Sequence, residues 1–226
     1  MSVEVRDVMG RVAIAVTPEA PFIEIVEAMR RYAVGAVAVI DAERRPMGIV
    51  SEDDLILKEA DLARHSTSMY ETRNQGEMHR KATGVIAREL MTTPAITVTP
   101  GRPLREAARL MHDKRVKQLP VVDPATGRIV GTLHCADVLR VFLRPAEELL
   151  TEIRDLPLDP ETFTVEVNKG VVTIAGRVKR ASEALQIVEQ IYRVEGVVDV
   201  VSQITADMDD RLQIIPPLRE DGAPRL

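Results

Sequence analysis

The sequence predicts an α+β protein with two pseudo-symmetric β-α-β-β-α repeats followed by a small α-β-β-α-β domain. Residues 8–41 and 90–123 align without a gap at a constant shift of 82 positions, which places Val16-Thr17-Pro18 on Val98-Thr99-Pro100. Within each copy, apolar residues change between helical spacing and short continuous runs. After Pro145 the pattern becomes a helix, a hairpin, a helix and a strand. A repeat present only twice predicts a pair with two equivalent clefts, since a solenoid needs more units.

The elements of each repeat follow one order. A short extended run, 14–17 or 96–99, stops at a proline. A helix with apolar residues at helical spacing comes next, carrying Phe22, Ile25, Val26 and Met29 in the first copy and Leu104, Ala107, Ala108 and Met111 in the second. Two strands follow, predicted over 36–40 and 48–50 and over 119–122 and 129–133. A second helix is expected to begin after Ser51 and after His134.

The last domain has its own turn signals. Pro145 precedes a helix over 146–153, and alternating apolar residues predict a strand over 163–167. Asn168-Lys169-Gly170 predicts a turn into a strand over 171–175, which we expect to end at Gly176. A helix over 182–192 is expected to be capped by Gly196 before a last strand over 197–204.

These patterns predict five segments: a first repeat over 1–57, a polar connector over 58–84, a second repeat over 85–144, the small domain over 145–206 and a mobile or partner-bound tail over 207–226. The connector is too long for an ordinary connection. We expect it to extend the preceding helix and then form a mobile loop, which is either a tolerated surface insertion or a lid over a cleft.

Composition excludes several classes of function. The 226 residues are 45% hydrophobic, only 3% aromatic and without Trp, and the net charge of -5 divides into +2 over 1–145, -5 over 146–206 and -2 over 207–226. No part has the basic surface of a nucleic-acid binder. Cys135 is the single cysteine, no apolar run approaches a membrane span, and the first residues are charged. We therefore expect a cytoplasmic protein, with membrane binding disfavoured.

The repeat resembles the cystathionine-β-synthase (CBS) domain family, and the two copies resemble a Bateman module. The resemblance covers about residues 3–143. It rests on Asp7-Val8-Met9 and Glu89-Leu90-Met91, on the Val-Thr-Pro runs, on Leu119-Pro120-Val121-Val122-Asp123 and on Gly48-Ile49-Val50-Ser51-Glu52-Asp53-Asp54. It implies a pseudo-symmetric pair that dimerises into a disk and binds adenosine-containing ligands in clefts between the repeats.

Residues 146–206 resemble the BON domain family. The resemblance rests on Val165 and Val167, on the run from Gly170 to Val178, and on Val194-Glu195-Gly196-Val197. It implies attachment to phospholipid or other envelope surfaces. The charge of -5 over this segment opposes binding to an anionic membrane, which normally uses basic residues.

Ser51 and Asp54 are the sharpest candidate site, because they match the Ser/Thr-x-x-Asp nucleotide motif of the CBS family. A helix N-terminus suits a phosphate, and an ionised carboxylate can accept both hydroxyls of a ribose. The same tetrapeptide is also a helix-capping pattern, and the two roles are compatible. In the second copy, His134 and Asp137 stand at these positions, so that cleft is expected to be empty, weaker or pH-sensitive.

Lys117 and Gln118 stand where CBS proteins often place a basic residue against phosphate, whereas the first copy has Gly35 and Ala36. Pseudo-symmetry lets Lys117 serve a ligand held by Ser51 and Asp54, or it is simply a solvated lysine. The full set of candidate nucleotide-binding residues is Ser51, Asp54, Ile14, Gly35, Ala36, Val37, Asp137, His134, Ile96, Lys117, Gln118 and Pro120.

The sequence therefore predicts a non-enzymatic regulatory or sensor protein that binds an adenine nucleotide, AMP or ATP, with the BON domain as an output or docking unit. No catalytic motif and no metal-ligand spacing is present. A homodimer is expected, because the helices present small residues at Ala28, Ala33, Ala107 and Ala108. Two alternatives stay open: a constitutive dimeric scaffold with vestigial clefts, and attachment to an envelope surface through BON.

Overall fold

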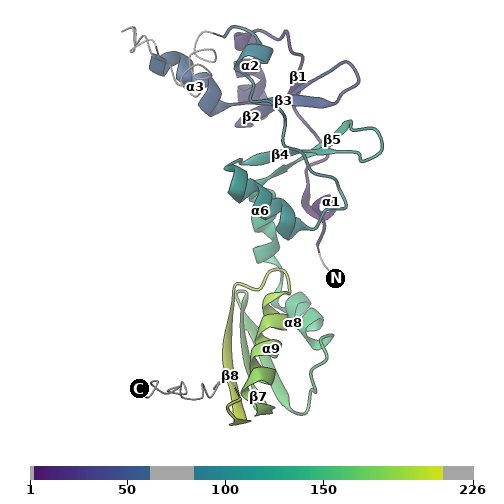
Figure 1. Ribbon diagram of the computed structural model, residues 1–226, viewed down its shortest axis with the longest axis vertical. Helices are drawn as coiled ribbons and strands as arrows, with labels where there is room; N and C mark the ends of the chain where they lie inside the picture. Colours follow the sequence, from purple (N-terminus) through teal and green to yellow (C-terminus); the bar gives the residue numbers. More distant parts are fainter. Residues whose placement is uncertain (1–2, 62–83, 211–226) are drawn as a thin grey trace, which may run out of the picture. The chain divides into compact units, whose positions relative to one another are not determined.

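The computed structural model describes residues 3–61 and 84–210, and the chain divides into two compact units, Met1–Arg140 and Val141–Leu226 (Figure 1). The loop expected in the connector and most of the expected tail lie outside the described residues. Each unit is an α+β arrangement, as the sequence predicted. The predicted repeat order is present in both copies, and a short helix that the sequence did not predict precedes each one.

The first unit contains the two repeats. The first copy consists of α1 (Val5–Val8), β1 (Ala15–Val16), α2 (Phe22–Tyr32), β2 (Ala36–Ile40), β3 (Pro46–Ser51) and α3 (Glu52–Asp61). The second consists of α5 (Ala87–Leu90), α6 (Leu104–Lys114), β4 (Gln118–Val122), β5 (Ile129–His134) and α7 (Cys135–Leu139). The 3-10 helix η1 (Arg140–Leu143) follows α7 and leads into the second unit. The first strand of the second copy is reduced to one bridge between Val98 and Val121.

Strand pairing repeats the sequence symmetry. β1 runs parallel to β2, while β2 and β3 are antiparallel, as are β4 and β5. The ladder shifts register after Val39 in the first copy and after Val121 in the second, which are equivalent positions. The ends of the ladders match too, because Ala36 faces Ser51 and Gln118 faces His134. The residues that follow β3 and β5 therefore begin their helices from the same place in each copy.

Helices α2 and α6 form for the same reasons in the two copies. A proline stands at the N-cap of each, where its fixed φ suits the entry into the helix. Each ends at a residue in the left-handed region, Ala33 or Arg115. The predicted apolar positions turn inward, because Ile25 and Met29 are buried in the first copy and Met111 in the second. Ala107 is fully buried as well, so it cannot belong to the outer helix face that we expected it to form.

The short segment before each repeat packs on the other repeat. The amide of Val5 donates to the carbonyl of Arg102, and Gly10 exchanges two backbone hydrogen bonds of 2.9 Å with Thr132 of β5. In the reverse direction, the amide of Ala87 donates to Ala20, and Thr92 exchanges two bonds with Ile49 of β3. The core of the first repeat accordingly contains residues 87, 90 and 91 beside those of α2, β2 and β3. Each copy is completed by a segment of its neighbour.

Glycines make room for the exchanged segments. A Cβ at Gly48 would lie 2.6 Å from Sδ of Met91 and 2.8 Å from the carbonyl oxygen of Thr92. A Cβ at Gly131, the equivalent position, would overlap the carbonyl oxygen of Gly10. Both glycines belong to the repeat pattern in the sequence. The structure shows that this pair permits the close approach of backbone from the other copy.

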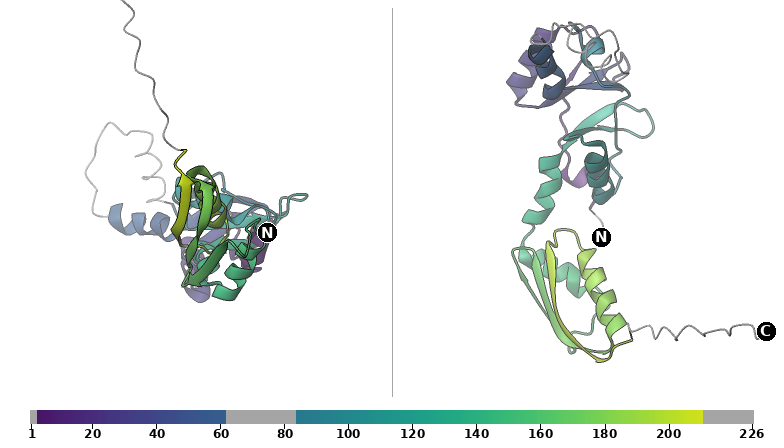
Figure 2. Two further views of the ribbon diagram at one scale, coloured as in Figure 1. Left: turned by 90° about the horizontal axis from the view of Figure 1, so that it is seen from below. Right: turned by 60° about the vertical axis from the view of Figure 1, so that its left-hand side comes forward.

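The second unit is a three-stranded sheet covered by two helices. Its elements are α8 (Ala146–Arg154), β6 (Phe163–Asn168), β7 (Val171–Arg180), α9 (Ala181–Tyr192) and β8 (Asp199–Met208), so the predicted order is confirmed. The strand order is β6-β7-β8, with an antiparallel β6–β7 hairpin and a parallel β7–β8 pair joined through α9. Both helices lie against one face of the sheet (Figures 1 and 2), where Leu149, Ile153, Ile174 and Ile191 form the core.

Three boundary predictions in this unit were wrong. Gly176 does not end β7, which continues to Arg180; it is needed because a Cβ there would overlap the ring of Phe163 and lie 2.7 Å from the carbonyl oxygen of Thr162. The helix ends at Tyr192 as expected, but its C-cap is Arg193, and Gly196 lies in the following loop with φ +99°. The last strand spans Asp199–Met208, because pairing with the longer β7 carries it into the expected tail.

Candidate functional site

Ser51 and Asp54 lie where β3 passes into α3. The amide of Glu52, the first residue of α3, donates to the carbonyl of Gly35 at 2.9 Å and so holds the start of this helix beside β2. In the second copy the amide of Cys135 donates to Lys117 at the same distance. These hydrogen bonds fix the start of the helix relative to the neighbouring strand in both copies. The side chains in the first turn of each helix therefore have a defined position.

The Ser51–Asp54 pair makes the capping interaction that its spacing predicts. The carboxylate of Asp54 accepts from the Ser51 amide at 2.9 Å and from the Ser51 hydroxyl at 2.8 Å. The Asp54 amide donates back to Ser51 Oγ at 3.4 Å. Asp54 is 8% exposed. In the second copy the Asp137 carboxylate accepts from the His134 amide at 2.9 Å, and Asp137 is equally buried. Capping is thus common to both copies and does not distinguish them.

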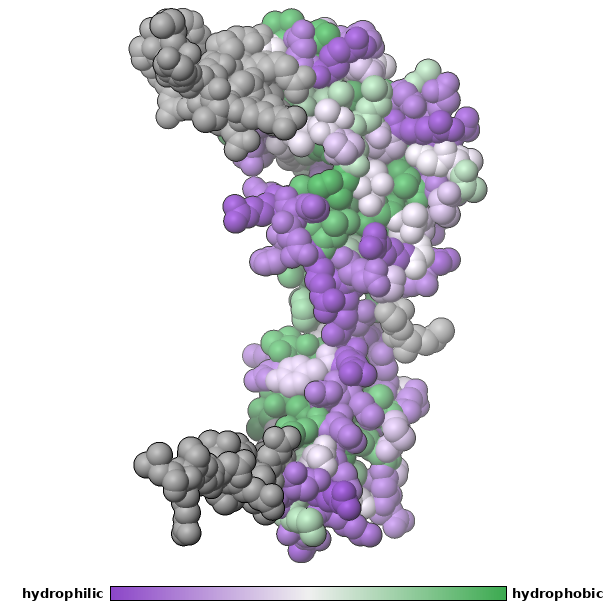
Figure 3. Space-filling view, viewed as in Figure 1, coloured by the Kyte–Doolittle hydropathy of each residue, from purple (hydrophilic) through white to green (hydrophobic). Residues whose placement is uncertain are grey.

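A cleft of about 500 Å³ separates the two repeats beside Ser51 and Asp54. Its volume falls in the range of ligand pockets in proteins. One wall comes from β2, β3 and the first turn of α3, and the other comes from the second repeat. The described residues that line it are Gly35, Ala36, Ile49, Ser51, Glu52, Asp53, Asp54, Thr92, Pro94, Ile96, Lys114, Arg115, Val116, Lys117, Gln118 and His134. Figure 3 shows an apolar area bordered by hydrophilic side chains on this unit.

Basic and acidic side chains enter the cleft from different elements. Lys114, Arg115 and Lys117 come from the end of α6 and the start of β4, and all three are exposed. Among the described residues, none of these three side chains takes part in an ion pair. The acids Glu52, Asp53 and Asp54 all belong to the first turn of α3. The cleft therefore has one basic wall and one acidic wall.

The equivalent cleft in the other half of the pair is much smaller. Its volume is about 20 Å³, and its described lining residues are Val12, Ile14, Val34, Ala36, Ala38, Gln118, Pro120, Thr132 and His134. His134 lines both clefts. The chain positions that match Lys114, Arg115 and Lys117 are Tyr32, Ala33 and Gly35, so no cation replaces them here. Asp137 faces Arg140 at 3.6 Å and is not among the lining residues.

The structure brings most of the predicted site residues to these two clefts. Those in the larger cleft are Gly35, Ala36, Ser51, Asp54, Ile96, Lys117, Gln118 and His134, and the smaller cleft adds Ile14 and Pro120. Val37 is fully buried in the core of the first repeat, and Asp137 is held in its cap. Lys114 and Arg115 also line the larger cleft and were not predicted, although they precede Lys117 in the chain; Thr92 and Pro94 were not predicted either.

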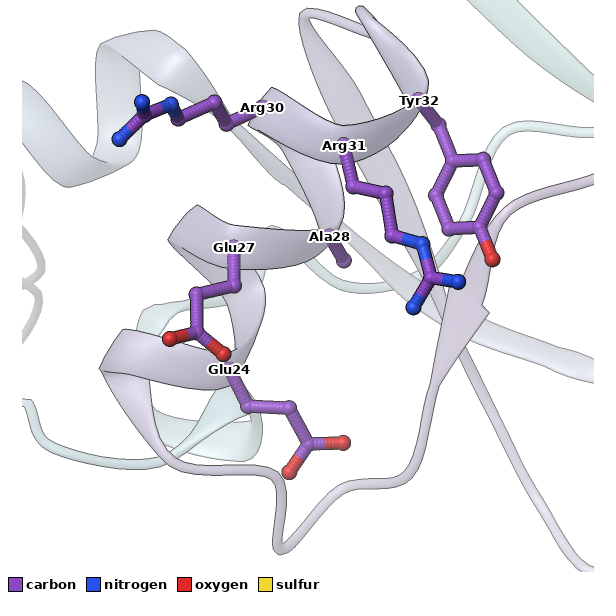
Figure 4. Close-up of a pocket in the computed structure, with 6 residues that line it drawn as sticks. All are labelled: Glu24, Glu27, Ala28, Arg30, Arg31 and Tyr32. Carbon is purple, nitrogen blue, oxygen red and sulfur yellow. The ribbon is translucent and has the colours of Figure 1, made fainter.

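A second surface depression, of about 480 Å³, contains none of the predicted site residues (Figure 4). Its described lining side chains all come from α2: Glu24, Glu27, Ala28, Arg30, Arg31 and Tyr32. The guanidinium of Arg31 lies 5.5 Å from the centre of the Tyr32 ring, which is a cation–π distance. Because a single helix supplies all the described lining groups, these residues give a small ligand no opposing wall.

Within residues 3–61 and 84–210, no cluster of three or more histidine, cysteine, aspartate or glutamate side chains is placed to hold a metal ion. None of the helices in the same ranges combines the length and the apolar character needed to cross a membrane.

Comparison with known proteins identifies both parts of the chain. A family model described as CBS domain matches residues 5–61 and 87–144, and one described as BON domain matches residues 146–208. The chain is 33% identical over 140 residues to "Uncharacterized protein MK0525" of Methanopyrus kandleri and 28% identical over 143 residues to the chloroplastic CBS domain-containing protein CBSX2 of Arabidopsis thaliana. These matches cover 62% and 59% of this chain, and 63% and 60% of the relatives' own lengths.

Among solved structures, the chain is similar to CBSX2 crystallised in complex with AMP. The TM-score is 0.54 and the identity 26%, and the match covers 62% of this chain and 96% of that one. The matched part corresponds in extent to the repeat pair that contains both clefts.

Proposed function

Because the chain belongs to the CBS domain family and carries a BON domain after its repeat pair, we propose that it is a regulatory protein that binds an adenine nucleotide in the larger cleft. The observation that carries this proposal is the cleft of about 500 Å³, to which the first repeat contributes Ser51 and Asp54 and the second contributes Lys117. The presence of AMP in the similar CBSX2 structure supports an adenosine-containing ligand.

The arrangement of donors and acceptors suits a nucleotide. The Asp54 carboxylate has only acceptor sites, so it can accept hydroxyl groups of a ribose while keeping its bond to the Ser51 amide. Apolar side chains of Ile49, Pro94 and Ile96 line the same cleft and can cover a base. The cationic side chain of Lys117 supplies a partner for phosphate. A ligand held in this way contacts both repeats at once.

Regulation would follow from that shared contact. A nucleotide that binds better when the two walls face each other stabilises that packing of the repeats, and it shifts the population toward it. We assign no catalytic step to the chain, and we propose BON as the output or docking unit. The regulated partner and a cytoplasmic location belong to the same proposal.

Calorimetric titration of the full chain with adenosine, AMP, ADP and ATP tests the proposed function. We expect saturable binding with one site per chain, because the smaller cleft of about 20 Å³ cannot admit a nucleotide as it stands. Mass spectrometry of any small molecule that co-purifies with the protein gives an independent identification. If none of the four ligands binds and nothing co-purifies, the chain is better described as a scaffold with vestigial clefts.

We also propose that the repeats form a homodimer. Ile23 on α2 and Ile56 on α3 are 63% and 61% exposed, so each leaves apolar surface open to solvent. Burying such side chains against a second copy is favourable by about 25 cal/mol per Å² of apolar surface. Sedimentation velocity at micromolar concentration should show twice the mass of one chain, and an Ile23→Glu/Ile56→Glu variant should shift the protein to monomer. A monomeric wild-type protein would contradict the proposal.

A further inference from the structure

The two walls of the larger cleft carry opposite charge, and this division orients a ligand. Glu52, Asp53 and Asp54 occupy the first turn of α3, while Lys114, Arg115 and Lys117 face them from the second repeat. A phosphate placed at the start of α3 would meet three carboxylates, whose repulsion opposes the favourable helix dipole. The phosphate end of a nucleotide is therefore directed to the basic wall, and the ribose to the acidic one.

The basic wall carries three positive charges, which is more than are required to pair with a single phosphate group. All three cations are exposed, and in the described parts of the chain none of their side chains is engaged in an ion pair. They fall within four consecutive positions, 114–117, so a chain of phosphates can pass along them. The smaller cleft provides an internal comparison, because Tyr32, Ala33 and Gly35 stand at the matching positions and bring no charge.

From these observations we propose that the larger cleft binds a nucleoside di- or triphosphate more tightly than the nucleoside or the monophosphate. In this proposal Lys114 and Arg115 contact the phosphates beyond the first. This inference rests on the proposed function, since it assumes that Asp54 holds the ribose in the same cleft. It also implies that a cationic adenosyl ligand is disfavoured, because the basic wall would repel it.

The test is a series of calorimetric titrations of the full chain with adenosine, AMP, ADP and ATP. Wild-type affinity should increase from adenosine to ATP. Exposed charge pairs contribute about 0.2–1 kcal/mol each, so Lys114→Gln or Arg115→Gln should weaken ATP binding about threefold, and the double variant about tenfold. Adenosine affinity should stay within about twofold, because the nucleoside has no phosphate to contact.

A matched control separates local contact from net charge. Arg109 is an exposed cation of α6 that does not line the cleft, so Arg109→Gln changes the net charge equally and should leave ATP affinity nearly unaltered. Raising the salt concentration should reduce the advantage of ATP over adenosine, because added ions screen exposed charges.

The outcomes distinguish the two proposals. If adenosine and ATP bind equally well, lose affinity in Asp54→Ala and respond to neither Lys114→Gln nor Arg115→Gln, the nucleotide site stands and the selection for polyphosphate is wrong. If Arg109→Gln weakens ATP as much as the cleft variants do, the effect is one of net charge and the assignment of Lys114 and Arg115 fails. If none of the adenine ligands binds, the proposed function itself is overturned.

Discussion

Asp54 and Asp137 make the same bond to the backbone and are equally buried, but they differ in the space beside them. Asp54 lines a cleft of about 500 Å³, whereas the equivalent cleft near Asp137 has about 20 Å³. Substitution of each by alanine removes one capping carboxylate. Asp54→Ala also loses the bond from the Ser51 hydroxyl, and Asp137→Ala loses the ion pair with Arg140, so the thermal stability of both variants is measured beside ligand binding.

We predict that Asp54→Ala weakens adenine-nucleotide binding about tenfold or more, while Asp137→Ala changes it by less than about twofold. The loss of charge-assisted hydrogen bonds to a ribose costs about 1.5–3 kcal/mol, which corresponds to a factor of ten or more in affinity. Calorimetry on both variants, with thermal melts as a control for folding, checks the prediction. Equal losses in both variants would show that the ranking of the two clefts is wrong.

Gly48 provides a second test at the scale of one residue. An added Cβ would meet Sδ of Met91 at 2.6 Å and the Thr92 carbonyl at 2.8 Å. Gly48→Ala should lower the free energy of unfolding by about 1–3 kcal/mol, as overpacking does elsewhere. Gly10→Ala is the control, because its Cβ would lie 3.5 Å from the Thr132 carbonyl, an ordinary contact. Chemical denaturation of both variants should show a loss for Gly48→Ala alone.

The sequence predicted those site residues that belong to a family motif or that could be assigned by matching positions in the two copies. Ser51 and Asp54 carry a family motif, and the 82-position shift linked Lys117 to the first cleft through Gly35. Lys114 and Arg115 were not predicted as site residues because they stand at the end of a helix, where exposed polar residues are common in any protein. Only the packing of the two copies places that helix end beside α3 of the other repeat.

At the scale of elements, the start of α9 depends on a residue far along the chain. The Asp210 carboxylate accepts from the Ser182 amide at 2.9 Å and from the Ser182 hydroxyl at 2.6 Å. The Ser182 hydroxyl, followed by its amide, lowers the pKa of Asp210 below the ordinary value of 3.8. Asp159 before β6 has a lowered pKa as well, chiefly because it accepts from the hydroxyl of Thr162.

These shifts predict acid sensitivity of the second unit. A carboxyl group whose pKa is lowered in the folded state stabilises folding above its unfolded pKa, and the contribution is lost as the pH falls through the folded value. The melting temperature of this unit should therefore decrease as the pH is lowered from about 5 to about 3. The melting temperature of the Asp210→Asn variant should decrease less over the same pH range. Identical pH profiles for wild type and variant would show that Asp210 is not responsible.

Elements were predictable where one local pattern decided them. Helices α2 and α6 and strand β2 follow from apolar spacing and flanking turn residues, and their centres agree with the structure. Gly176 was misread because a glycine within a strand can mark either its end or a close approach, and only the packed position of Phe163 decides between them. The exchanged helices α1 and α5 are four residues long and have no periodicity to detect.

For the whole molecule, the division into two compact units predicts two thermal transitions. A ligand stabilises only the unit that binds it, and at a hundredfold excess over Kd it raises the free energy of unfolding of that unit by about 2.7 kcal/mol. The transition temperature of that unit rises accordingly. ATP should therefore raise the transition of residues 1–140 and leave that of residues 141–226 unchanged, since the cleft lies within the first unit. Scanning calorimetry of the full chain measures both. A shift in both transitions would show that the binding site is shared between the units.

The exchange of short segments between the repeats also determines when the first unit can fold during synthesis. Gly10 pairs with Thr132, 122 positions later in the chain. At about 5–20 residues per second, the N-terminal segment waits roughly 6–24 s on the ribosome for its partner strand. The first copy likewise lacks α5 until residue 90 has been made. Such distant contacts slow folding. The first copy can complete its core only once residue 91 has been made, and the second can pair with Gly10 only once residue 132 has been made, so a chain interrupted between the copies leaves the core of the first repeat unfinished.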